Sequence, residues 1–255
     1  WTDMASIVNS LQTSISKVQS AERELFFDKQ KVFASMIKKF KVKLDHEIPS
    51  ECYNDTNVPF SILDALMGQL LDLETGLNNL HIEENMFELE LSEFNALPLY
   101  KVTILECQSM WDIISYCESH MEHWMNQNLK HVNSKWENQV KNLASALKEK
   151  HLPLISKDFK ESNACLKTYE KIDKILECIQ IIVALKGAPL RERHYKKISS
   201  SILLEIKLTT VNDPQITCGS LFKAKINDNR KKLYEVIEIA LRQYSVERAL
   251  KNISK

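Results

Sequence analysis

Four glycines in 255 residues, Gly68, Gly76, Gly187 and Gly219, constrain what this chain can fold into more than any other feature of its sequence. An average soluble protein contains about 7% glycine. Parallel α/β sheets and sandwiches place glycine at their tight turns, where a side chain would clash. The scarcity of glycine therefore predicts an all-α protein with little or no sheet.

The spacing of apolar residues agrees with this expectation. Apolar residues recur three and four positions apart, which is typical of amphipathic helices. The pattern predicts helices over about residues 4–44, 60–80, 99–126, 134–147, 157–185 and 229–253. The first of these, if unbroken, would be about 60 Å long at a rise of ~1.5 Å per residue. Because that length does not suit one compact core, we expect an elongated array of helical bundles.

Two segments between these helices predict irregular structure. Residues 46–59 hold Pro49 and Pro59 around a polar cluster, which indicates a loop. Residues 86–98 alternate apolar residues with glutamates, as a strand does, up to Pro98. No partner strand is evident nearby, so we expect an extended connector that Pro98 ends.

Helix boundaries are marked by capping residues. Ser134 and Glu137 have the spacing of a capping box, in which each side chain accepts from the other residue's amide. Gly187 suits the C-terminal cap of one helix, and Pro189 suits the first turn of the next. The stretch 187–198, GAPLRERHYKKI, therefore predicts a helix start.

Charge and hydropathy exclude several function classes. The chain has 34 Lys and Arg against 34 Asp and Glu, a balance that argues against binding to nucleic acid or to an anionic membrane. No apolar run approaches the ~20 residues of a membrane span. The six cysteines include no CxxC pair, which is typical of free thiols in a reducing compartment. The chain opens WTDMASIVNS, without an initiator methionine, so we expect a piece of a longer protein.

Motifs for enzymatic chemistry are missing from the sequence. A phosphate-binding loop needs clustered glycines, and neither GxGxxG nor GxxxxGK[ST] occurs. Cys117, His120 and His123 could share a helix, but the third is rotated by about 240° from the first, at ~100° per residue, and packed or solvated side chains are the default reading. No GxSxG motif is present either. We predict no catalytic, cofactor-binding or metal-binding residue in this segment.

The basic cluster in 187–198 has a structural interpretation instead. His194 lies four residues from both Leu190 and Ile198, which places it near the buried side of its helix. Arg191 and Arg193 can form charge-assisted hydrogen bonds to neighbouring carbonyls or carboxylates. We expect a structural junction between two helices rather than a catalytic site.

The same stretch resembles the signature of the dynein heavy-chain linker region, (A/P)-(L/M)-(K/R)-x-R-H-W. Residues 189–195 read PLRERHY and depart from it with Tyr195 in place of tryptophan. Residues 87–98, 216–222 and 234–253 resemble further family segments in the same order, and the likeness is looser over 1–80.

The resemblance implies a mechanical role. It implies that the chain is part of the linker, a lever joining the dynein tail to the ring of AAA+ modules and moving as ATP is turned over. Residues 1–85 would be an N-terminal helical bundle portion of the linker and residues 86–255 its central helical subdomain. The structural junction would consist of Gly187, Pro189, Arg191, Arg193, His194 and Tyr195.

The resemblance also implies partners and a location. Partners would be the AAA+ ring of the same chain, the tail and other dynein subunits, and microtubules indirectly, with no nucleic acid and no membrane. No cofactor is expected in this segment, since ATP and Mg²⁺ would bind elsewhere in the full chain. We expect the cytoplasm and cytoskeleton, in the axoneme of a cilium or flagellum because most heavy-chain types are ciliary. The alternative is an elongated helical scaffold or tethering protein without a motor, which composition and periodicity fit equally well.

Overall fold

The structure is a computed structural model that describes residues 2–53, 55–201, 210 and 215–253. In these residues it contains helices joined by short connections and no strand, so the all-α prediction is confirmed. An isolated β-bridge joins Asn128 to Thr217. The chain forms two compact units, residues 1–109 and 110–255, and the division falls within one long helix. The division between 1–85 and 86–255 expected from the sequence stays a prediction.

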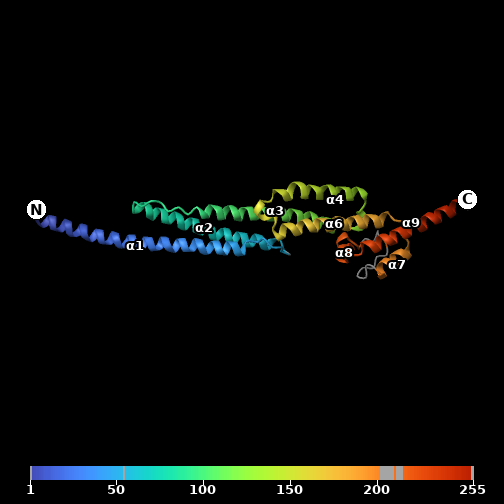
Figure 1. Ribbon diagram of the computed structural model, residues 1–255, viewed down its shortest axis with the longest axis horizontal. Helices are drawn as coiled ribbons and strands as arrows, with labels where there is room; N and C mark the ends of the chain where they lie inside the picture. Colours follow the sequence, from blue (N-terminus) through green and yellow to red (C-terminus); the bar gives the residue numbers. More distant parts are fainter. Residues whose placement is uncertain (1, 54, 202–209, 211–214, 254–255) are drawn as a thin grey trace. The chain divides into compact units, whose positions relative to one another are not determined.

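Unit 1 is built on an antiparallel pair of helices (Figure 1). The first is α1 (Thr2–Glu47) and the second is α2 (Asn57–Met86). Lys29 of α1 contacts Glu83 of α2, and the later Phe33 lies against the earlier Gly76, which fixes the antiparallel direction. α3 (Ala96–Met125) begins in this unit and follows an extended connector over residues 89–95.

The core of unit 1 comes from one apolar stripe on each of its three helices. These stripes are Phe26, Phe33, Ile37, Phe40 and Leu44 from α1, Leu63, Leu66, Leu70, Leu73 and Leu80 from α2, and Leu97, Ile104 and Cys107 from α3. Aromatic rings fill the contacts with the connector, where Phe33 and Phe94 meet edge to face with ring centroids 5.2 Å apart. Gly76 leaves room for Phe33, because a Cβ at this glycine would lie 3.0 Å from the Phe33 ring.

Unit 2 contains the rest of α3 and the following elements (Figure 1). They are the 3-10 turn η1 (Leu129–His131), α4 (Ser134–Ala146), the π-helical turn η2 (Leu147–His151), the 3-10 turn η3 (Leu152–Leu154), α5 (Lys157–Lys160), α6 (Asn163–Gly187), α7 (Glu192–Ser201), α8 (Cys218–Lys223) and α9 (Arg230–Ile253). A large apolar cluster joins η1, α6, α7, α8 and α9.

Several predicted boundaries are wrong by a few residues. Pro59 and Pro98 lie in the first turns of α2 and α3, where the missing amide costs nothing, rather than in the preceding connections. The capping box at Ser134 is also wrong, because Asn133 is the N-cap of α4 and its side chain accepts from the Trp136 amide at 2.9 Å. Asparagine and serine are equally good N-cap residues, so the sequence alone does not show whether Asn133 or Ser134 is the cap.

The helix expected over 157–185 is two helices. α5 ends at Lys160, and Ser162 then caps the start of α6 by accepting from the Cys165 amide. The apolar periodicity continues across the break, which is why the pattern did not reveal it.

Candidate functional site: a polar junction between α6, α7 and α9

The turn between α6 and α7 is held by its own backbone. The Ala188 amide donates to the Ala184 carbonyl at 3.2 Å and closes the last turn of α6. The Arg191 carbonyl accepts from the amides of His194 and Tyr195, at 2.8 and 3.2 Å, and so opens α7. The direction of the chain therefore changes within residues 188–191.

The side chain of His194 also stabilises this turn. Its Nδ1 accepts from the Arg191 amide at 3.0 Å, which reproduces the backward bond that glutamate makes in a capping box. Its Nε2 lies 3.0 Å from Oε1 of Gln243 in α9. Because an amide oxygen only accepts, both bonds form together when His194 is neutral and carries its proton on Nε2. One imidazole thus joins the start of α7 to α9.

The two arginines extend the same contact towards α9. Arg191 bonds to Glu247, and Arg193 bonds to Gln243 and lies 3.7 Å from Glu247. Both arginines are more than half exposed, whereas the His194 ring is buried at 5% exposure. Charge pairs at the surface stabilise weakly, so the buried imidazole bond is the stronger part of the contact.

Beneath the polar layer the junction is apolar. Tyr195 and Ile198, on the inner side of α7, are buried in the cluster shared with α6, α8 and α9. Leu190 packs against the same cluster from the turn. The polar contacts therefore lie along the edge of a packed core and fix how α7 meets α9.

Lys186 holds the other side of the junction. Its Nζ donates to the carbonyls of Leu129, Lys130 and Val132 in and after η1, at 2.7, 3.2 and 2.6 Å. Burial lowers the pKa of this ammonium below its usual value. The last turn of α6 is thereby tied to the chain that leads from α3 into α4.

The predicted junction residues fall in two groups. Arg191, Arg193, His194 and Tyr195 come together at the start of α7, as described above. Gly187 is the last helical residue of α6 and the C-terminal cap is Ala188, so the expected cap is wrong by one residue. Pro189 precedes α7 by three residues, so its expected place in the first turn is wrong as well.

Lys196 lies on the opposite, exposed side of α7. It pairs with Glu192 one turn earlier at 2.6 Å. The hydrogen bond and the charge of Lys196 lower the pKa of Glu192. This pair marks the solvent face of the helix.

Sequence reasoning missed the partners of the junction. Gln243 and Glu247 are four residues apart on α9, so they share a face, and Glu247 has the charge that the two arginines require. The four-residue spacing of Gln243 and Glu247 was the only sequence signal for these partners. It is a weak signal, because many other acidic residues in the chain have a polar residue four positions away. Lys186 was visible as a basic residue in the last turn of a helix, a position that favours contact with carbonyls.

The cysteine and histidines weighed as metal ligands do not converge. Cys117 is buried and its pKa is raised to about 11, chiefly by burial, while His123 is exposed. His120 packs edge to face on Tyr116, with ring centroids 4.6 Å apart. Within the described residues no group of three metal-binding side chains occurs. Likewise, no helix in the described part of the chain is long and apolar enough to cross a membrane.

Comparison with known proteins extends the sequence resemblance. The family model for the dynein heavy chain, N-terminal region 2, matches residues 100–255, which include the whole junction. The ciliary dynein beta chain of Tripneustes gratilla is 17% identical over 255 residues, all of this chain. Human dynein axonemal heavy chain 1 is 21% identical over 243 residues, 94% of this chain, and mouse dynein axonemal heavy chain 2 is 20% identical over 192 residues, 74% of it.

The chain spans only a small part of these relatives. It covers 6% of the sea-urchin protein, 5% of the human one and 4% of the mouse one.

Proposed function

Because the chain belongs to the dynein heavy chain family, as a segment of its N-terminal region, we propose that it forms part of the mechanical linker of a dynein heavy chain. In this role it couples ATP-driven changes in the AAA+ ring to movement along microtubules. The observation that carries the proposal is the family match over residues 100–255, which contains α6, α7, α9 and the contacts between them.

The junction supports a lever role. A lever transmits movement only if it bends at its hinges and is stiff everywhere else. Here one buried imidazole, two arginines and one lysine fix the ends of α6 and α7 against neighbouring elements. The proposed role of the junction is stiffness at the point where the chain turns.

The segment itself is proposed to be non-catalytic. ATP and Mg²⁺ would bind to modules elsewhere in the full chain. The partners of this segment would be the AAA+ ring, the tail and other dynein subunits, and it would engage microtubules only indirectly. The names of the relatives, ciliary and axonemal, support a cytoskeletal location in the axoneme of a cilium or flagellum.

The test is His194→Ala in the full-length heavy chain. The substitution removes the part-buried bonds to Arg191 and Gln243, and each such hydrogen bond contributes about 0.5–1.5 kcal/mol to the unfolding free energy. Microtubule gliding should slow because the lever is looser, while the affinity of the ring for nucleotide should stay unchanged. The melting temperature of the 255-residue chain should fall as well.

Lys196→Ala is the matched control, since it alters an exposed side chain two residues along the same helix. It should leave gliding velocity and melting temperature nearly as they are. A His194→Ala motor that glides at the normal speed, although the segment is destabilised, would contradict the lever role of the junction.

A further inference from the structure

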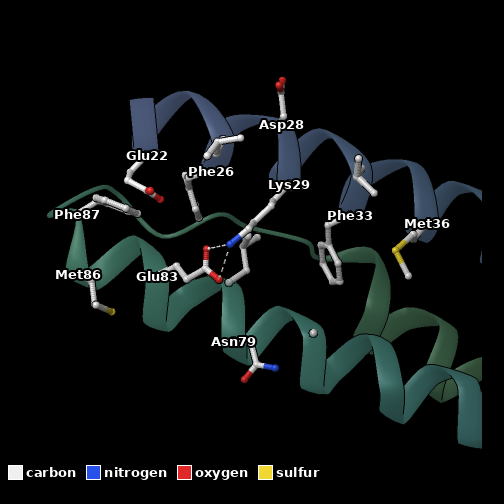
Figure 2. A pocket seen from close by; sticks show the side chains of 14 residues that line it. Glu22, Phe26, Asp28, Lys29, Phe33, Met36, Asn79, Glu83, Met86 and Phe87 are labelled. Atoms are coloured by element: carbon white, nitrogen blue, oxygen red, sulfur yellow. Dashed lines mark hydrogen bonds and ion pairs between the residues drawn. The ribbon is translucent and has the colours of Figure 1, made fainter. Parts of the chain in front are cut away.

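Two adjacent lysines of α7 take no part in the junction described above. Lys196 pairs with Glu192 on the solvent side of the helix, where the two side chains are 75% and 80% exposed. Elsewhere an exposed lysine can face a carboxylate of another helix, as Lys29 faces Glu83 across the groove between α1 and α2 (Figure 2). Lys197 is exposed too, and among the described residues it has no ion-pair partner. The structure of unit 2 therefore does not explain why two cations stand together here.

Serines follow these lysines at a spacing that occurs once in the sequence. Ser199 lies three residues after Lys196 and two after Lys197, and Ser200 comes next. Adjacent lysines or arginines occur at 38–39, 196–197 and 230–232, and only 196–197 has a serine or threonine two residues after the pair. Serine kinases with an acidic substrate groove select such a hydroxyl, because their carboxylates pair with the two cations before it.

Ser199 lies in the last turn of α7, which can open at low cost. The helix has ten residues and ends at Ser201. A helix this short is marginal without its packing, and the ends of helices fray first. Ser199 is half-buried, one turn after Tyr195, whereas Ser200 is exposed. A kinase can therefore reach the Ser199 hydroxyl when the last turn opens.

We propose that Ser199 is a phosphorylation site for a serine kinase that recognises Lys196 and Lys197. The Ser199 Oγ forms a bond to the γ-phosphorus of Mg-ATP, and the bond from that phosphorus to the oxygen bridging it to the β-phosphate breaks. ADP leaves with the bridging oxygen, and the hydroxyl proton passes to the carboxylate base of the kinase. The serine thereby gains a group that carries about −1.5 to −2 charges at neutral pH.

A phosphate on Ser199 opposes the packing of α7. Negative charge is unfavourable at a helix C-terminus, where the helix dipole already presents carbonyl oxygens. Ser199 also adjoins Ile198, which is fully buried in the apolar cluster of unit 2, and a phosphate must keep its water. Pairing with Lys196 or Lys197 offsets this little, because exposed ion pairs stabilise weakly. Phosphorylation therefore loosens the last turn of α7.

The first experiment tests whether the site is modified. The 255-residue chain is incubated with Mg-ATP and the catalytic subunit of cAMP-dependent protein kinase, and tandem mass spectrometry locates the phosphate. Ser199 should be modified, and Lys197→Ala should lower the initial rate about tenfold because one recognised cation is lost. Ser200→Ala is the matched control and should be modified at Ser199 at the usual rate. A chain that takes up no phosphate, or takes it up at a different residue, would overturn the proposal.

The second experiment measures the effect on α7. The melting temperature of the phosphorylated chain should lie about 2–4 °C below that of the unmodified chain. Ser199→Asp should lower it in the same direction. Ser200→Asp places the same carboxylate at the exposed neighbour, so it changes the charge at the helix end alone and should lower the melting temperature less. Phosphorylation without a change in melting temperature, or equal effects of the two substitutions, would contradict the loosening of α7.

The third experiment uses the full-length heavy chain, and this step rests on the lever role proposed above. Treatment with the same kinase should slow microtubule gliding, because α7 also carries His194 and both arginines of the junction. Ser199→Ala should remove this response. A motor that is phosphorylated at Ser199, with its segment destabilised, and still glides at the normal speed would count against the lever role. Absence of phosphate at Ser199 would instead count against the modification site alone.

Discussion

At the scale of single residues, charged residues occupy left-handed backbone positions after two helices, where glycine is usual. Glu88 follows the end of α2 with φ 55°, in the left-handed region. The Leu89 amide donates to the Glu84 carbonyl and the Glu88 amide to that of Asn85, which is the Schellman pattern. Lys225 does the same after α8 with φ 56°, while no described glycine has a positive φ.

Glu88→Gly should therefore stabilise the chain. Glutamate in the left-handed region costs roughly 1 kcal/mol, which glycine does not incur. Thermal unfolding should show a higher melting temperature for this variant. Glu90→Gly removes the same charge from the connector, at a residue without positive φ, and should not raise it. Equal effects of the two substitutions would mean that strain at Glu88 is absent.

At the scale of the helices, two glycines within α2 have opposite surroundings. A Cβ at Gly68 would meet nothing within 4 Å, while a Cβ at Gly76 would lie 3.0 Å from the Phe33 ring. Gly68→Ala should raise the unfolding free energy by about 0.5–1 kcal/mol, because alanine favours the helix. Gly76→Ala should gain less or lose stability, since the buried Phe33 must shift.

Denaturant titration of both variants gives the two free energies. Equal increases in unfolding free energy for the two variants would show that Phe33 can shift away from a Cβ at residue 76 without loss of stability.

The helices were largely predictable and their contacts were not. Periodicity located α1, α2, α3 and α6 because one face of each is buried. It did not locate the cap at Asn133 or the break before Ser162, since these depend on which of several polar residues meets a free amide. The basic half of the junction was visible in the sequence, but Gln243 and Glu247 became its partners only through packing of α7 on α9.

At the scale of the whole molecule, the four glycines are dispersed and no two are neighbours in the sequence. Gly68 and Gly76 lie inside α2, Gly187 ends α6, and Gly219 is the second residue of α8. A phosphate loop needs consecutive free amides, which clustered glycines supply. The elongated arrangement expected from the sequence stays a prediction.

Calorimetric titration of the 255-residue chain with Mg-ATP should accordingly show no saturable heat. Inorganic phosphate serves as a second ligand and should behave alike. A dissociation constant in the micromolar range for Mg-ATP would contradict the non-catalytic role proposed for this segment.

The junction also sets an order of events during synthesis. Gln243 follows His194 by 49 residues and Glu247 follows Arg191 by 56. A ribosome adding about 5–20 residues per second needs roughly 2–11 s to make that stretch. During this interval α7 has been synthesised, while the acceptors for its arginines and imidazole have not. A nascent chain halted before α9 would thus display an unpaired cluster of cations, and the turn would reach its final angle only once the last helix had left the ribosome.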